Sequence, residues 1–196
     1  MRPSTEIRAD NYTANHTTGT ITGNALNLPG VTGAFTGSTD QIIQWVACKW
    51  GIDEDIVRSQ IAKESWWHQS NVGDYSNDPN VCHPDFRATI PCPESIGAGQ
   101  VRYQYHTAAF ANNNAIKSSA YNLDYTYYRW RSCYNGNESW LNQFERGQDY
   151  AAGDVWGCVG LWFAGRWHTQ PAEQYITAVK DYLNQRIWLT SGFQNG

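Results

Sequence analysis

One stretch constrains the fold of this chain more than any other: Asp53 to Trp67, with the sequence DEDIVRSQIAKESWW. Asp53 is a good N-cap, and the two acids after it suit the positive end of a helix dipole. Val57, Ile61 and Glu64 are spaced so that they share one helix face. The stretch therefore predicts an amphipathic helix whose core-facing side carries a carboxylate near its C-terminal end.

The carboxylate of Glu64 has two interpretations. Charged residues are rarely fully buried without a partner, so Glu64 can be a helix-end residue that turns to solvent or pairs with an arginine. It can instead be a general acid, because desolvation raises the pKa of a carboxyl group and lets it hold a proton at neutral pH. Other segments of the chain must decide between the two.

Length and composition limit the classes of protein. A chain of 196 residues with 41% hydrophobic residues can bury one sizeable core, so we expect a single domain over residues 38–196. Residues 1–37 are rich in Thr, Gly and Asn and predict an extended or disordered arm. The net charge is -4 and basic runs are absent, so a nucleic-acid partner is not expected. No apolar run is long enough to span a membrane.

Aromatic residues are unusually frequent, with ten Trp and twelve Tyr. Aromatic faces suit the C–H faces of sugar rings, although a Trp-rich core explains several of them. The long segment from Gln69 to about Glu94 is dense in Asn, Asp, Gly and Pro and predicts a functional or disulfide-pinned loop.

Five cysteines indicate the compartment and some of the cross-links. Cys82 and Cys92 flank a Pro-rich loop and are expected to form a disulfide, and Cys133 and Cys158 are the next pair. Cys48 is then a buried free thiol. Paired cysteines in loops are typical of a secreted or extracytoplasmic protein. Met1 is followed by RPSTEIRAD rather than by an apolar core, which we interpret as a mature form with an added start.

A zinc site is the alternative for part of this set. It would use Cys82, His83 and Cys92, but their spacing matches no common zinc finger. We therefore expect no metal and no other cofactor.

The remaining periodicity is mostly helical. It predicts a mainly α fold in one domain, with the long disulfide-pinned loop and at most a small β element. The expected helices run from about Asp40 to Trp50, from Ser118 or Ser119 to about Cys133, from Ser139 to Arg146, and after Pro171, where Tyr175, Val179, Tyr182 and Leu183 form a buried stripe.

Three short motifs follow one another: Glu64-Ser65, then Gly97-Ala98-Gly99-Gln100, then Ala120-Tyr121-Asn122 at a helix start. In this order and spacing they resemble the motifs of lytic transglycosylases and goose-type lysozymes, members of the lysozyme-like superfamily with SLT-type domains. The resemblance covers roughly residues 40 to 188. Two positions depart from it: Gly99 stands where Met is usual, and Leu123-Asp124 stand where Ala-Gly is usual.

The resemblance implies a lysozyme-like fold that cleaves the β-1,4 bond between N-acetylmuramic acid and N-acetylglucosamine in peptidoglycan. Glu64 would protonate the glycosidic oxygen and then act as base while a 1,6-anhydro ring closes. Gln100 and Tyr121 would bond the sugar, and Asn122 would orient the sugar or the acid. Ser65, Gly97 and Trp66 complete the expected substrate-binding set, Ser65 also as a support for the helix end.

Several alternatives stay open. A hydrolytic muramidase, or an enzyme acting on chitin or chitosan, needs a second carboxylate to activate water. The candidates for it are Asp74, Asp78, Asp85 and Asp124. A non-catalytic cell-wall binding module is the alternative of another class. In every case the expected partner is a β-1,4-linked amino-sugar polymer, and the expected state is a monomer.

Overall fold

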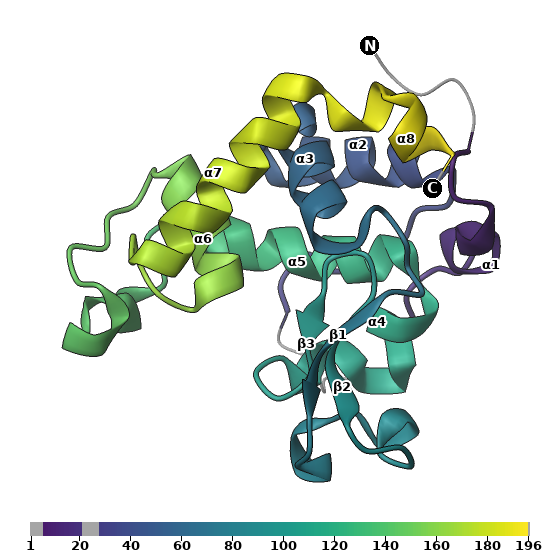
Figure 1. The fold of residues 1–196 in the computed structure, drawn as a ribbon, viewed down its shortest axis with the longest axis horizontal. Helices are drawn as coiled ribbons and strands as arrows, with labels where there is room; N and C mark the ends of the chain where they lie inside the picture. Colours follow the sequence, from purple (N-terminus) through teal and green to yellow (C-terminus); the bar gives the residue numbers. More distant parts are fainter. Residues whose placement is uncertain (1–5, 21–27, 196) are drawn as a thin grey trace.

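The structure, a computed structural model, describes residues 6–20 and 28–195. It is mainly helical, with one small antiparallel sheet, as the sequence predicted (Figure 1). The α-helices are α1 (Tyr12–Asn15), α2 (Thr39–Trp50), α3 (Glu54–Ser65), α4 (Asn114–Lys117), α5 (Ser119–Tyr134), α6 (Val155–Ala164), α7 (Gln170–Gln185) and α8 (Ser191–Gln194). The strands are β1 (Val72–Ser76), β2 (Cys92–Ile96) and β3 (Val101–Arg102).

Helix α5 runs through the middle of the molecule, between the other long helices and the sheet (Figure 1). On one side α2 packs on α5, and α3, α6 and α7 complete a large apolar core. On the other side a smaller apolar cluster joins residues of the sheet, Ile96 and Val101, to Tyr125 of α5 and Ala115 of α4. Because both clusters use α5, its first three turns are almost entirely buried.

The predicted helix ends are confirmed by their caps. Ser38 forms a capping box with Gln41 at the start of α2, and Gly51 ends that helix in the left-handed conformation. Asp53 caps α3 by accepting from two backbone N–H groups, and the side chain of Ser118 caps α5.

The sheet lies within and just after the long loop, in the order β1-β2-β3. Val72 pairs with Ile96, and Ser76 pairs with Cys92. The predicted Cys82–Cys92 disulfide is confirmed, and it ties the loop to the first residue of β2. The small β element and the disulfide-pinned loop therefore occur together.

The second predicted disulfide, Cys133–Cys158, is also confirmed and joins α5 to α6. Cys48 is free as expected, but the prediction that it is buried is wrong, because it is exposed. It lies two turns after the exposed Gln41, on the outer face of α2.

Two segments between α5 and α7 differ from the prediction. Instead of one helix, residues 139–146 form two 3₁₀ segments, Ser139–Asn142 and Phe144–Arg146. Helix α6 was not predicted, because its glycines have low helix propensity. A Cβ on Gly157 would lie 2.3 Å from the ring of Trp167, so this glycine is required by close packing.

The N-terminal segment also differs from the extended or disordered arm that we expected. Its residues 9–15 form short helical turns, Ala9–Asn11 and α1. Arg8 is buried and donates 2.7 Å hydrogen bonds to the carbonyl oxygens of Trp66 and Phe193. The segment is therefore fastened to the end of α3 and to the C-terminal residues. Residues 16–20 and 28–37 form neither helix nor strand, and residues 1–5 and 21–27 of the predicted arm lie outside the described residues.

Candidate active site

Glu64 lies in the last turn of α3, one turn beyond Ile61 on the same face. Val57 and Ile61 are fully buried, whereas Glu64 is half-buried. The hydroxyl of Tyr175 on α7 donates a hydrogen bond to Glu64 Oε1. The carboxyl group is therefore held between two helices that pack together in the core.

The surroundings of Glu64 favour its neutral form. Burial is the largest influence and raises the pKa of Glu64 to about 7, and the negative charge of Asp74 acts in the same direction. The hydrogen bond from Tyr175 and the charge of Lys63 oppose this shift. Near neutral pH the carboxyl group is thus divided between its two protonation states, so it can either donate or accept a proton.

Two buried tyrosines near Glu64, Tyr175 and Tyr127, remain protonated. Burial raises the pKa of Tyr175 and of Tyr127 well above 10, so both keep their hydroxyl protons. The Tyr127 hydroxyl donates to Oε1 of Gln60 at 3.1 Å. The sequence predicted that Tyr175 belongs to a buried stripe but not that it contacts Glu64. Its position on the core-facing side of the last long helix was the only available signal.

The Gly97–Gln100 motif forms a tight turn between β2 and β3 against α5. Gly97 has φ +85, and a Cβ there would lie 2.2 Å from Nδ2 of Asn122. A Cβ on Gly99 would lie 2.2 Å from Oγ1 of Thr126. The close packing on α5 leaves no room for a side chain at position 99, where the resembled family usually has Met.

Asn122 fixes this turn in place. Its Nδ2 donates to the carbonyl oxygens of Ile96, at 3.1 Å, and Ala115, at 2.8 Å. Its Oδ1 accepts from the N–H of Gly99 at 2.8 Å. Because Asn122 is fully buried, it positions the turn and does not itself present a group to a ligand.

Gln100 connects the turn to the end of α3. Its Nε2 donates to the carbonyl oxygens of Asn71, at 3.2 Å, and Gly97, at 2.8 Å. The side chain of Asn71 donates in turn to the backbone oxygen of Glu64 at 3.4 Å. The structure therefore brings Glu64 and Gln100 into one network, although they belong to different motifs.

Three other expected ligand contacts lie elsewhere. Tyr121 is 1% exposed and packs in the smaller apolar cluster. Ser65 is buried and its hydroxyl donates to Ile61 in the preceding turn, which supports the helix end as the sequence predicted. Trp66 packs against the ring of Phe193. None of these three side chains lines the pocket that lies near Glu64.

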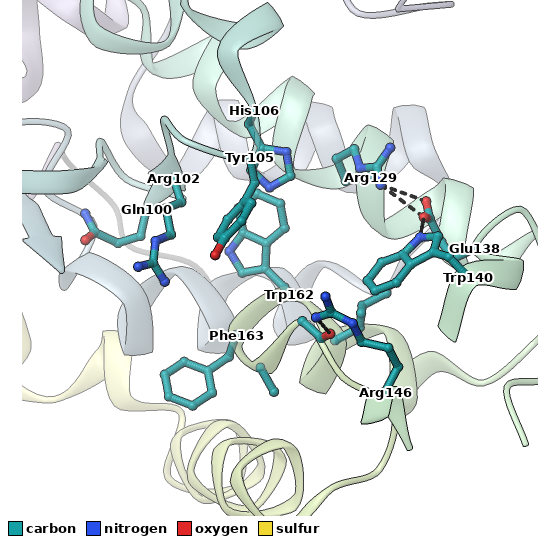
Figure 2. A pocket seen from close by; sticks show the side chains of 13 residues that line it. Gln100, Arg102, Tyr105, His106, Arg129, Glu138, Trp140, Arg146, Trp162 and Phe163 are labelled. Carbon is teal, nitrogen blue, oxygen red and sulfur yellow. Dashed lines mark hydrogen bonds and ion pairs between the residues drawn. The ribbon is translucent and has the colours of Figure 1, made fainter. Parts of the chain in front are cut away.

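A pocket of about 430 Å³ begins at Gln100 and extends along α6 (Figure 2). One of its lining residues, Phe163, stacks on Tyr175 with ring centroids 4.7 Å apart. Glu64 itself does not line the pocket, but it is connected to two residues that do: to Gln100 through Asn71, and to Phe163 through Tyr175. The residues that form the walls of this pocket were not predicted from the sequence, although the high aromatic content was a signal. The aromatic lining residues are Tyr105, Trp140, Trp162 and Phe163.

The four candidates for a second carboxylate occupy different environments. Asp124 is fully buried and accepts from Lys49 at 2.6 Å and Trp50 at 2.7 Å, so it is structural and cannot activate water. Asp78 is exposed and caps a 3₁₀ turn in the loop, and Asp85 is exposed and accepts from an asparagine side chain.

Asp74 is the candidate that is coupled to the acid. It is exposed on β1, its carboxylate accepts from the hydroxyl of Ser95, and its charge contributes to the raised pKa of Glu64. Of the four, Asp74 is therefore the one that acts electrostatically on Glu64.

The structure offers no support for the zinc alternative. Cys82 and Cys92 are joined in a disulfide, and within residues 6–20 and 28–195 no three His, Cys, Asp or Glu side chains form a group that could hold a metal ion. None of the helices in the described part of the chain is long and apolar enough to cross a membrane. No protein-family model, curated protein or solved structure matched this chain.

Proposed function

We propose that this protein cleaves β-1,4 glycosidic bonds in peptidoglycan, with Glu64 as general acid and then base. The observation that carries the proposal is the carboxyl group of Glu64, whose pKa is raised to about 7 and which Tyr175 connects to Phe163 in the wall of an aromatic pocket. A general acid works best when its pKa lies near the working pH. The order of the three sequence motifs supports the same conclusion.

In the proposed reaction, protonated Glu64 donates its proton to the glycosidic oxygen as the bond to the muramoyl C1 breaks. The carboxylate then takes the proton of the muramoyl 6-hydroxyl, whose oxygen bonds to C1 and closes a 1,6-anhydro ring. Proton donor and acceptor are the same group, so Glu64 is regenerated without a second carboxylate. Gln100, which lines the pocket, is placed to contact the sugar near the cleaved bond.

A hydrolytic version of the reaction is the second candidate, and Asp74 favours it. In that case Asp74 accepts a proton from a water molecule, and the hydroxide adds to C1 in place of the sugar's own hydroxyl. The exposure of Asp74 and its electrostatic coupling to Glu64 agree with this role. Chitin or chitosan, which share the β-1,4 linkage, are further substrates for this version.

The third candidate is a non-catalytic wall-binding module. The aromatic pocket suits it equally well, but a binder has no use for a carboxyl group whose pKa is raised to about 7. Two disulfides agree with a protein that works outside the cytoplasm, where the cell wall lies.

Digestion of purified peptidoglycan tests the proposal. We expect soluble muropeptides with 1,6-anhydro ends, which mass spectrometry distinguishes from reducing ends because they lack one water. Reducing ends would assign the hydrolytic version. An absence of released fragments, with the polymer still bound, would leave the binding module as the function.

A further inference from the structure

The pocket beside Glu64 carries more positive than negative charge. Three arginines and one glutamate line it: Arg102, Arg129, Arg146 and Glu138. Arg129 and Glu138 form an ion pair at 3.0 Å. Arg102 pairs with Glu94, which lies outside the lining, through Nε at 2.8 Å. Within the described part of the chain Arg146 has no carboxylate partner, so its charge is not compensated.

Arg146 is also incompletely hydrogen-bonded. Its Nη1 donates to the carbonyl oxygen of Gly165 at 3.2 Å, and its guanidinium lies 5.4 Å from the ring centroid of Trp140. Its Nε is shielded from solvent and has no acceptor among the described residues. Because Nε is closed to solvent, a ligand in the pocket would meet the outer guanidinium nitrogens, Nη1 and Nη2, rather than Nε. Figure 2 shows the Arg146 guanidinium turned toward the pocket, below Trp140 in that view.

Arg102 lies at the opposite end of the pocket, beside Gln100 (Figure 2). Its side chain is 39% exposed, and its ion pair with Glu94 uses only Nε. Between the two arginines stand the rings of Tyr105 and Trp162. Aromatic faces and separated guanidinium groups are the elements that a polymer of sugar rings with carboxylate side groups requires.

We infer that this pocket binds a carboxylate-bearing segment of the glycan, with Arg146 as the main specificity-determining residue and Arg102 as the second. The inference rests on the proposed function for the sugar backbone, whereas the carboxylate preference comes from the arginines. Two parts of peptidoglycan supply a carboxylate: the lactyl group of muramic acid where no peptide is attached, and the stem peptide. Neutral chitin supplies neither, so it binds less tightly.

Binding measured with the Glu64→Gln protein tests this inference without turnover. Three ligands are compared by calorimetry: a chitin hexamer, glycan strands stripped of peptide, and glycan strands that keep their peptides. We expect at least one of the two anionic strands to bind about tenfold more tightly than chitin, with an affinity that falls as salt is added. The preferred strand identifies which carboxylate is recognised.

Adding Arg146→Gln should abolish this preference, so that the affinity for the anionic strands falls to that for chitin. Arg166→Gln is the matched control, because Arg166 is exposed and does not line the pocket. Equal affinity for all three ligands would overturn the inference, as would an Arg146→Gln variant that weakens all three alike. If that variant fails to fold, the salt dependence of the Glu64→Gln protein decides, and salt-independent binding of the anionic strands overturns the inference.

The outcome for the proposed function is separate. Wild-type protein that binds anionic strands through Arg146 but leaves peptidoglycan uncut would refute the cleavage reaction and keep the carboxylate site. Cleavage of peptidoglycan without a preference for anionic strands would refute the carboxylate site and keep the cleavage reaction.

Discussion

The hydroxyl of Tyr175 donates a hydrogen bond to the carboxyl group of Glu64, across 111 residues of sequence. This bond joins α7 to the last turn of α3 and favours the charged form of Glu64, against the desolvation that favours the neutral form. The ring of Tyr175 also stacks on Phe163 in the pocket wall. The protonation of the candidate acid and the shape of the pocket therefore depend on the same side chain.

Replacing Glu64 by Gln should leave the fold intact and reduce cleavage by about 10²–10⁴-fold or more, because Gln keeps the size but has no proton to donate. Release of soluble muropeptides measures the effect. Glu54→Gln, at the other end of α3, is the matched control and should retain near wild-type activity. Retention of more than a tenth of wild-type activity in Glu64→Gln would show that Glu64 is not the acid.

The same substitution should change how stability depends on pH. Burial raises the pKa of Glu64 to about 7, so the folded protein binds more protons than the unfolded chain between about pH 4.5 and 7. The contribution of Glu64 to the free energy of unfolding is therefore fully present below about pH 4.5. It declines by roughly 3 kcal/mol as the pH rises to 7.

Glu64→Gln has no such titration. Denaturant unfolding across this range should show Glu64→Gln gaining stability relative to wild type as pH rises. A difference between the two proteins that does not vary with pH would contradict the raised pKa.

Tyr175→Phe should move the alkaline limit of activity to higher pH. Its hydroxyl lowers the pKa of Glu64, so its removal raises that pKa, by roughly one pH unit for a hydrogen bond to a charged group. The pH profile of kcat/KM measures this shift. Tyr182→Phe, on the same helix, is the control and should keep the wild-type profile. An unchanged profile in Tyr175→Phe would mean that the hydroxyl does not act on the acid.

Local patterns predicted much of this fold. The caps at Ser38, Asp53 and Ser118 bond only to groups within the same helix start, so the sequence near them is sufficient. The disulfide Cys82–Cys92 closes a short loop, which again is a local relationship. The position of Glu64 on the inner face of α3 follows from helical spacing alone.

Contacts between distant segments could not be predicted in this way. Tyr175 looked like an ordinary core residue, because its partner is fixed only when α7 packs on α3. Asn122 and Tyr121 looked like ligand contacts, but the packing of α5 buries both. Arg146 stood in a segment predicted as helix, and its place in the pocket depends on the 3₁₀ geometry found there.

Asp124→Asn should destabilise the protein rather than affect chemistry directly. The buried carboxylate accepts from Lys49 Nζ at 2.6 Å, from Trp50 Nε1 at 2.7 Å, and from the backbone of residues 32 and 33. Disrupting a buried ion pair costs about 3 kcal/mol, which corresponds to a fall in Tm of roughly 6–12 °C for a chain of this length. Asp181→Asn, an exposed position on α7, is the control. A Tm within about 2 °C of wild type would contradict the structural role.

Substitution of Asp74 tests the reaction type. If Glu64 works alone and the sugar's own hydroxyl closes the ring, Asp74→Asn should reduce activity by no more than about tenfold. It should also move the alkaline limit to lower pH, because loss of the negative charge lowers the pKa of Glu64. If Asp74 instead activates water, the loss should reach the 10²–10⁴-fold typical of general base catalysis.

Asp78→Asn and Asp85→Asn, exposed in the same loop, are the controls and should stay near wild type. Mass spectrometry of the products completes the test, because a thousandfold loss in folded Asp74→Asn, together with reducing ends from wild-type enzyme, would assign a hydrolase with Asp74 as its base.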